Sequence, residues 1–269
     1  MKHFVKFVGN WGKIDTTTIN NTKNTNIMIP RTITAQTIAS RESWSSIMEA
    51  IKKYWDEGYY ITDFDYGGGY YRVVMSKGTG WNGQAIRFGE TFPKEKIQEL
   101  WDKGYYITNA MHDGKDWIVV MSGVEDCRSQ SWFTRTNWND FKDTIKEYWD
   151  KDMVVTKLAC KTSGGTTVYC GIVSKMTYSQ EQKMKYYSGT PTPDIIDLCE
   201  PNTVLTDFYD VDGGVFAVTA SKTGWEDQTL GVKSSWDSAL EFIKKYWDKD
   251  YSLTTLSYYN GIWLVAMSK

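Results

Sequence analysis

Histidine, cysteine and proline are scarce in this chain. Its 269 residues include two histidines, four cysteines and five prolines. The cysteines show no metal-ligand spacing, and none has His3 or His112 at a neighbouring repeat position, so we expect no metal site, no cofactor and no catalytic residue. A phosphate-binding loop is also missing, because Gly67–Gly69 falls at a predicted hairpin turn and not between a strand and a helix.

Long apolar segments are absent as well. No run reaches the roughly 18 apolar residues that cross a bilayer, and the first residues lack the apolar stretch and cleavage site of a signal peptide. We therefore expect a cytoplasmic protein with no membrane partner. Thiols stay reduced in that compartment, which favours free cysteines, although Cys160 and Cys170 flank a predicted hairpin and could face each other across it.

Neither sign of charge dominates. Lys and Arg total 31 and Asp and Glu total 33, which gives a net charge of −2, and the two signs alternate along the chain. No basic stripe is present, so nucleic acid is not an expected partner. Hydrophobic residues make up 41% and aromatic residues 15%, which is enough for a folded core.

A repeat of 46 to 50 residues is the strongest signal that is present. It is anchored by Trp at four positions and by Cys199 at the fourth of the five. An isoleucine precedes each anchor by four residues and a threonine follows it by seven, which is typical of a repeat architecture. The columns are Trp55, Trp101, Trp149, Cys199 and Trp247; Ile51, Ile97, Ile145, Ile195 and Ile243; and Thr62, Thr108, Thr156, Thr206 and Thr254.

The second unit shows the predicted order of elements. A strand over 84–88 is followed by a helix over 91–101 with Pro93 in its first turn, a strand over 105–108, and a returning strand over 117–122. The returning strands are almost wholly apolar and end in serine. Their apolar character predicts burial on both faces, so we expect these strands to form an inner layer and the helices to cover the outside. Their serines are Ser76, Ser122, Ser174, Ser221 and Ser268.

Five such units predict an α/β repeat fold in a closed pseudo-fivefold ring, either a pentein-like α/β propeller or a five-bladed propeller variant. The first strand of each unit carries a glutamine, and the same count reaches Gln36 in the first unit. The chain ends soon after Ser268, so we expect it to be cut inside a unit and the ring to be sealed by its two ends. An open, curved stack of five units is the alternative.

This division gives one five-unit domain over residues 32–269, preceded by an N-terminal arm over residues 1–31. In the arm, Phe4–Val8 has the pattern of an added strand, and the polar segment Thr16–Thr25 has that of a loop. The sequence leaves open whether the arm packs on its own ring or on a partner.

The segments Val73–Gln84, Thr91–Ile97 and Trp101–Thr108 resemble a known domain. They contain the elements Trp-Asp-x-Gly-Tyr-x-Ile-Thr, Trp-x-Val-Val-Met-Ser and Gly-x-Gly-Trp/Phe-x-x-Gln. These are similar to the uncharacterised domain that follows the kinase domain in plant casein-kinase-like kinases and accompanies some bacterial caspase-like proteases. The resemblance implies an accessory, non-catalytic domain and supplies no active site, cofactor or substrate.

Loops that repeat Ser, Lys, Trp and Gln are the candidate ligand-binding positions. Residues 76–84 return in shortened form as residues 221–228, and loops of this kind on one rim are able to bind a ligand several times over. The alternative is structural, with Gln and Ser satisfying backbone groups where strands turn. The candidates are Lys77, Trp81, Gln84, Gln130, Gln182, Lys222, Trp225 and Gln228.

Three functions are compatible with these patterns. The first, which we favour, is a non-catalytic scaffold that binds a protein partner or regulates a partner enzyme. The second is a lectin-like module whose Trp81 and Trp225 loops stack on carbohydrate. The third is a pentein-type enzyme with a cysteine nucleophile, for which Cys127 is the cysteine to test. The fold alone does not separate the three.

Overall fold

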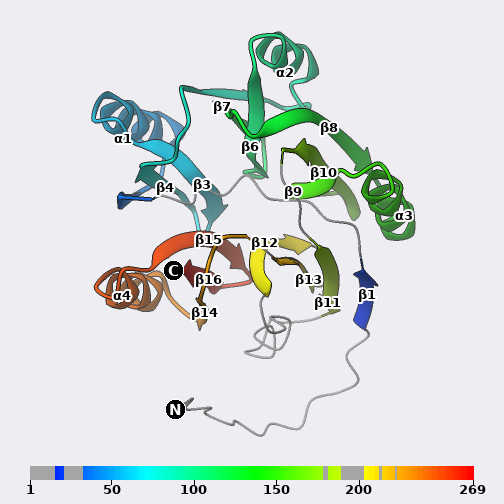
Figure 1. Ribbon diagram of the computed structural model, residues 1–269. Helices are drawn as coiled ribbons and strands as arrows, with labels where there is room; N and C mark the ends of the chain where they lie inside the picture. Colours follow the sequence, from blue (N-terminus) through cyan, green and yellow to red (C-terminus); the bar gives the residue numbers. More distant parts are fainter. Residues whose placement is uncertain (1–15, 21–32, 178–180, 189–202, 212–213, 222) are drawn as a thin grey trace, which may run out of the picture.

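Five antiparallel sheets and four helices make up the computed structural model, which describes residues 16–20, 33–177, 181–188, 203–211, 214–221 and 223–269 (Figure 1). Each sheet holds three consecutive strands in the order outer, middle, inner, and the fourth sheet has β1 as an additional strand. In the first, second, third and fifth units the chain runs from the outer strand through a helix to the inner strand and then back along the middle strand, and the segment between β11 and β12 of the fourth unit lies outside the described residues. The predicted order of elements is therefore correct in these four units.

The bounds of the elements follow the repeat. The outer strands are β2 (Ala35–Arg41), β5 (Gln84–Gly89), β8 (Cys127–Arg135), β11 (Gln182–Ser188) and β14 (Gln228–Lys233). The inner strands are β3 (Tyr60–Gly67), β6 (Tyr105–His112), β9 (Val154–Ser163), β12 (Thr203–Val211) and β15 (Ser252–Tyr259). The middle strands are β4 (Tyr70–Lys77), β7 (Trp117–Gly123), β10 (Thr166–Met176), β13 (Gly214–Ser221) and β16 (Ile262–Ser268). The helices are α1 (Trp44–Asp56), α2 (Lys94–Trp101), α3 (Trp138–Trp149) and α4 (Trp236–Trp247).

The inner strands contact one another in cyclic order. β3 packs beside β6, β6 beside β9, β9 beside β12 and β12 beside β15, and β15 packs beside β3 (Figure 1). The series of contacts therefore returns from the fifth sheet to the first. Two expectations were wrong. The strands that end in serine are the middle strands of the sheets and not an inner layer. Every sheet consists of consecutive strands, so the chain is not cut inside a unit.

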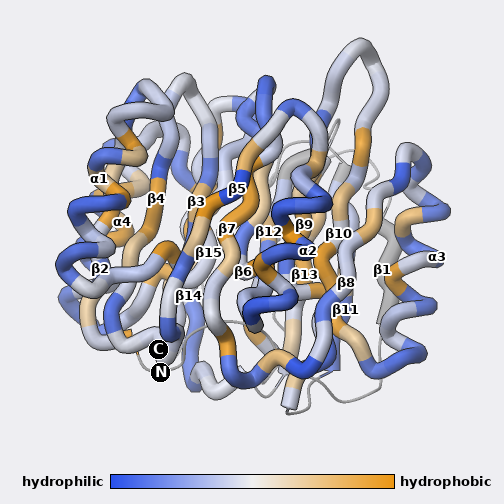
Figure 2. Tube along the Cα trace, turned by 90° about the horizontal axis from the view of Figure 1, so that it is seen from above, coloured by the Kyte–Doolittle hydropathy of each residue, from blue (hydrophilic) through white to orange (hydrophobic). Residues whose placement is uncertain are grey.

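The apolar middle strands form the core of each sheet. Val73, Val74 and Met75 are fully buried, and all seven residues of β7 are buried, as a strand covered on both faces requires. The helices cover the outside, with hydrophilic residues facing outward and hydrophobic ones toward the strands (Figure 2). Ile47, Ile97, Ile145 and Ile243 lie at these helix–sheet contacts with no exposed surface.

Three of the four described helices begin with a side-chain cap. Ser43, Asn137 and Ser235 each accept a hydrogen bond from a backbone N–H in the first turn of α1, α3 and α4. The exception is α2, which begins at Lys94 with Pro93 as an N-cap that has no side-chain bond, three residues later than predicted. The helix position that carries Ile195 and Cys199 lies outside the described residues.

A strand occupies part of the N-terminal arm. β1 (Thr16–Asn20) pairs antiparallel with β11, Thr16 opposite Tyr187 and Asn20 opposite Lys183. The prediction of a loop over Thr16–Thr25 was therefore wrong for its first five residues, because backbone pairing with an available sheet edge outweighs their polar composition. The strand predicted at Phe4–Val8 lies outside the described residues.

Candidate functional site

The glutamine side chains connect neighbouring sheets. Gln84, on the outer strand of the second unit, accepts hydrogen bonds from Trp55 Nε1 at 3.0 Å and from the Ile61 backbone N–H at 2.7 Å. Its amide nitrogen donates to the Ile61 carbonyl at 2.9 Å and to Ser122 Oγ at 2.9 Å. One carboxamide thus fills all its hydrogen-bonding positions between the first unit and the second.

The same arrangement recurs around the molecule. Gln130 and Gln182 accept from the anchors Trp101 and Trp149, and Gln228 pairs with both backbone groups of Leu205. Gln36 accepts from Trp247 Nε1 at 3.0 Å and from the Leu253 N–H at 2.6 Å, so it joins the first unit to the fifth. The glutamines therefore act as connectors between units that share no backbone ladder.

A β-bulge interrupts every inner strand at its repeated threonine. The pairing register shifts at Thr62, Thr108, Thr156, Thr206 and Thr254. The hydroxyl of Thr62 lies 2.7 Å from Ser76 Oγ, and that of Thr108 lies 2.7 Å from Ser122 Oγ. Because a bulge places two successive residues against one partner residue, both the threonine and the residue after it face the axis.

A polar cavity of about 30 Å³ lies where the five bulges meet. It is lined by the five threonines and by the five residues that follow them, Asp63, Asn109, Lys157, Asp207 and Thr255. Thr62, Thr108 and Thr254 are partly exposed, whereas all five following residues are buried. Three of the five threonines are therefore partly open to solvent, and the five residues that follow the threonines form a buried polar floor. The volume suits only molecules the size of water.

Charge on this floor is concentrated in three residues from three units. Lys157 Nζ lies 2.7 Å from Asp207 Oδ1 and 3.6 Å from Asp63 Oδ1. Burial acts to lower the pKa of Lys157, but attraction to Asp207 and Asp63 outweighs it and raises the pKa, so the ammonium stays charged. Buried ion pairs of this kind fix geometry more than they add stability.

Backbone N–H groups also donate hydrogen bonds to the carboxylates of Asp63 and Asp207. Asp63 accepts from the Leu256 N–H at 2.6 Å and from Asn109 Nδ2 at 2.8 Å, and Asp207 accepts from the Leu158 N–H at 2.5 Å. Each aspartate thus connects its own inner strand to a neighbouring one. The repeat did not reveal these residues, because their type differs at each of the five positions.

The other candidates from the repeated loops are dispersed. Lys77 Nζ lies 4.5 Å from the centre of the Tyr59 ring, in a cation–π contact. Trp81 and Trp225 occupy similar turns, in which their backbone N–H donates to Thr79 and Thr223 Oγ1. Lys222 lies outside the described residues. The four glutamines hold bonds within the chain, and ligand binding at all eight positions stays a prediction.

The cysteines and His112 lie in separate environments. Burial raises the pKa of the Cys127 thiol to about 12, so the thiolate that a nucleophile requires is not formed at neutral pH. Cys170 is a free thiol, and it lies one position out of register with Cys160, which pairs with Tyr169. His112 is half-buried at the end of β6. Among the described residues no group of three His, Cys, Asp or Glu is placed to hold a metal ion.

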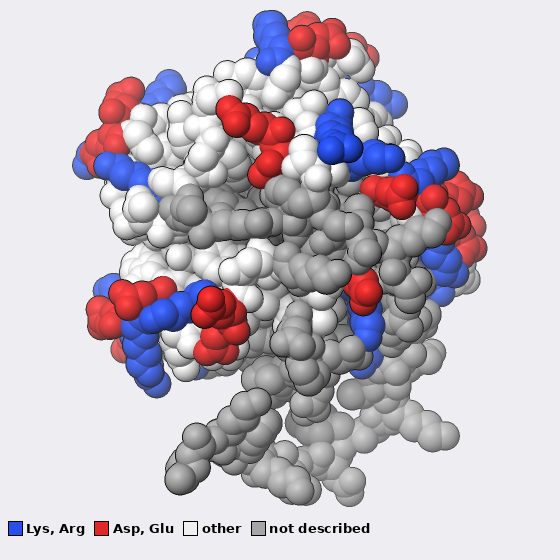
Figure 3. All heavy atoms as spheres, viewed as in Figure 1, with Lys and Arg blue, Asp and Glu red and all other residues white. Residues whose placement is uncertain are grey.

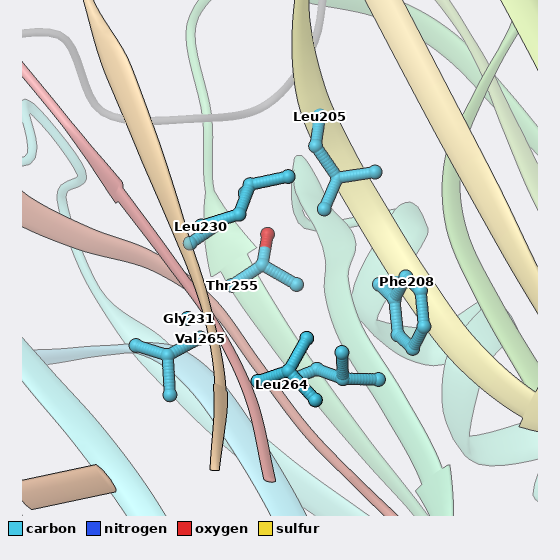
Figure 4. Close-up of a pocket in the computed structure, with 9 residues that line it drawn as sticks. Leu205, Phe208, Leu230, Gly231, Thr255, Leu264 and Val265 are labelled. Atoms are coloured by element: carbon cyan, nitrogen blue, oxygen red, sulfur yellow. The ribbon is translucent and has the colours of Figure 1, made fainter. Parts of the chain in front are cut away.

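An apolar cavity of about 10 Å³ lies between the fourth and fifth sheets. Leu205 and Phe208 of β12 face Leu230 of β14 and Leu264 of β16 across it, with Thr255 at one side (Figure 4). The space is at the lower limit for one water molecule, and its lining offers almost no polar partner. It is therefore a packing gap and not a binding site.

Aromatic side chains reach the surface beside the start of α1. Phe88 is 48% exposed and Tyr70 36%, and they are the most exposed large hydrophobic residues among the described residues. The Phe88 ring packs 5.3 Å from Trp44, and Tyr70 donates to Glu42 at 2.7 Å. Trp44 packs on Tyr71, and Tyr70 points to the other face of β4, where its ring lies 5.1 Å from the Arg72 guanidinium that stacks on Trp236 of α4. We call Trp44 and Phe88 the aromatic patch. Charges of both signs lie over the helices around the rim (Figure 3).

A family model described as Domain of unknown function (DUF7477) matches residues 16–132 of this chain. The matched segment contains the first two units and the beginning of the third, and the description carries no function. No curated protein matches the chain. Within the described residues, no helix has the length and apolar character needed to cross a membrane.

Proposed function

We propose that the protein is a rigid, non-catalytic scaffold that binds a protein partner through the aromatic patch. In this proposal the five sheets form a closed pseudo-fivefold ring of the pentein-like α/β propeller kind. The cyclic contacts of the inner strands support the ring, as do the hydrogen bonds that Gln36 makes with Trp247 and Leu253. A closed ring has no free sheet edge along its axis and holds its outer surface in one shape.

The observation that carries the proposal is the exposure of Phe88 beside Trp44. Large aromatic residues are enriched at the centres of protein interfaces, where they bury much surface at a small cost in side-chain entropy. Lys96 borders the patch, with its Nζ 5.9 Å from the Phe88 ring. An aromatic centre beside a cation suits a partner with an apolar residue flanked by an acidic one.

The test combines affinity capture with a measured binding constant. A protein captured by the wild type is purified, and its affinity is compared for wild type, Phe88→Ala and Lys53→Ala. We expect Phe88→Ala to weaken binding at least about tenfold, as a central aromatic does. Lys53 lies on α1 with a side chain 72% exposed and serves as the matched surface control. Equal affinity for all three proteins would refute the patch as the interface.

Carbohydrate binding is the second candidate. The Trp81 and Trp225 loops share one turn geometry, which is what a repeated stacking site requires. Glycan arrays probed with wild type, Trp81→Ala and Trp225→Ala separate this candidate from the first. Multivalent binding that is lost in both variants and kept in Phe88→Ala would favour the carbohydrate function.

A further inference from the structure

The floor of the axial cavity contains polar atoms without partners. Asn109 Oδ1 and Thr255 Oγ1 are both buried with no hydrogen bond, in side chains that are 2% and 3% exposed. The amide orientation of Asn109 is set, because its Nδ2 donates to Asp63 Oδ1. Unsatisfied buried polar groups are costly, so two of them in residues that line one cavity indicate that something else bonds them.

Lys157 adds spare donors to the same cavity. Its ammonium has three N–H groups, and one of them is used by Asp207 Oδ1 at 2.7 Å. The 3.6 Å separation from Asp63 Oδ1 is an ion pair beyond hydrogen-bonding distance. The residues that line the cavity thus offer N–H donors in Lys157, an acceptor in Asn109 Oδ1 and a hydroxyl in Thr255 that either donates or accepts.

We propose that the cavity is a binding site for ordered water, which accepts a hydrogen bond from Lys157 and donates to Asn109 Oδ1 and Thr255 Oγ1. Three hydrogen bonds are the usual number for a buried water, and about 30 Å³ gives room for one or two. The water connects the second, third and fifth units at the axis. No covalent step is involved.

The charges on the floor disfavour ions of either sign. Asp63 and Asp207 against Lys157 leave one net negative charge, which repels an anion. A second cation would lie against the Lys157 ammonium, which both carboxylates already neutralise in part. Backbone N–H groups of Leu256 and Leu158 offset the remaining negative charge. An uncharged molecule that both accepts and donates is the class that fits.

The test is a crystal structure of the full-length protein at a resolution that shows ordered water, with a second crystal soaked in rubidium bromide. We expect density about 3 Å from Lys157 Nζ and Asn109 Oδ1 and no anomalous signal at the axis. An anomalous peak of rubidium would overturn the proposal in favour of a cation, and one of bromide in favour of an anion. A cavity without density would also overturn it.

Substitution of Thr255 is a second, independent test of the proposed water site. Thr255→Val keeps the shape of the side chain and removes one partner of the water, so we expect the axial density to weaken or move. Thr37→Val is the control, because the Thr37 hydroxyl lies in outer strand β2 at 3.4 Å from the Tyr54 hydroxyl. Unchanged axial density in Thr255→Val would remove Thr255 from the site. If Thr255→Val does not fold, the two wild-type crystals decide the question.

Discussion

Single glutamine side chains do at each junction what a shared backbone ladder does inside a sheet. The carboxamide of Gln84 pairs with both backbone groups of Ile61, and it also bonds the indole N–H of Trp55. An amide matches a peptide group in its donor and acceptor geometry, so it extends the hydrogen bonding of one sheet toward the next. Serine, tryptophan and glutamine recur together because they form this single network.

Loss of this side chain is the first prediction at the residue scale. Gln84→Ala leaves the Ile61 N–H and carbonyl and the Trp55 N–H without partners in a part-buried junction. We expect the free energy of unfolding to fall by about 2–4 kcal/mol, measured by urea denaturation. Gln98→Ala is the control, since Gln98 is exposed and bonds Asp102 alone. A loss no larger than that of Gln98→Ala would contradict the connector role.

His112 provides a prediction of pH dependence. Its Nδ1 accepts from the Gly114 N–H at 3.0 Å, and its Nε2 is buried without a hydrogen bond. The pKa of His112 is lowered by burial first and by Lys161 next, while Asp113 and Asp116 act in the opposite direction. The His112 ring packs against Trp117, with the two ring centres 5.2 Å apart.

The direction of the pH dependence follows from the lowered pKa of His112. The folded pKa lies below the unfolded one, so the neutral ring stabilises the fold above the unfolded pKa of about 6.5. This stabilisation is lost as the pH falls through the folded pKa. We expect the denaturant midpoint to drop less between about pH 7.5 and about pH 5.5 in His112→Asn than in wild type. These two pH values lie on either side of the pKa of histidine in the unfolded chain. A parallel drop in both proteins would contradict the assignment.

Each helix has a start set by its own local sequence. Asn137 Oδ1 accepts from the backbone N–H of Asn139 at 2.7 Å and of Asp140 at 3.2 Å, and so caps α3. The proline at the same place in α2 has no such bond. The helices therefore depend on their caps to different extents, although the repeat places them alike.

Removal of the α3 cap is the prediction at the element scale. Asn137→Ala leaves two N–H groups at the helix start without a side-chain partner, and we expect a loss of about 1 kcal/mol in the free energy of unfolding. Asn137→Ser restores an oxygen acceptor and is expected to keep most of the stability. Thermal or urea unfolding measures both variants. Equal losses in the two would show that the cap is not the cause.

Elements were easier to predict than their connections. The apolar runs, the anchors and the Gly-containing turns predicted strand, helix, strand, strand correctly, because those signals are local. The bulge at each threonine was missed, since a bulge depends on pairing across two strands. The axial residues Asp63, Lys157 and Asp207 were missed because they differ in type from unit to unit and leave no periodic signal. The glutamine column was found, but its bonds to the preceding unit were not foreseen.

At the scale of the whole molecule, the first and fifth units meet as the other neighbours do. Gln36 contacts Trp247 and Leu253 as Gln84 contacts Trp55 and Ile61. Gly67 also lies against the fifth unit, where an added Cβ would stand 2.3 Å from Tyr258 Cβ. The contact between the fifth and first units therefore differs from the other contacts between units in covalent connection and not in packing.

A circular permutant tests this equivalence. The new chain begins at Val124, between β7 and β8, and ends at Gly123. A linker of six residues joins Lys269 to Thr34, and it is as long as the 78–83 segment between β4 and β5. Gln36 bonds Leu253, whose neighbour Ser252 pairs with Ser268, so the two joined ends lie close together. We expect a cooperative urea transition with a midpoint near that of the unpermuted 34–269 chain, since a closed ring keeps every junction wherever it is opened. An open stack would place the joined ends at opposite extremes, and the permutant would then unfold without cooperativity or fail to fold while the 34–269 control folds.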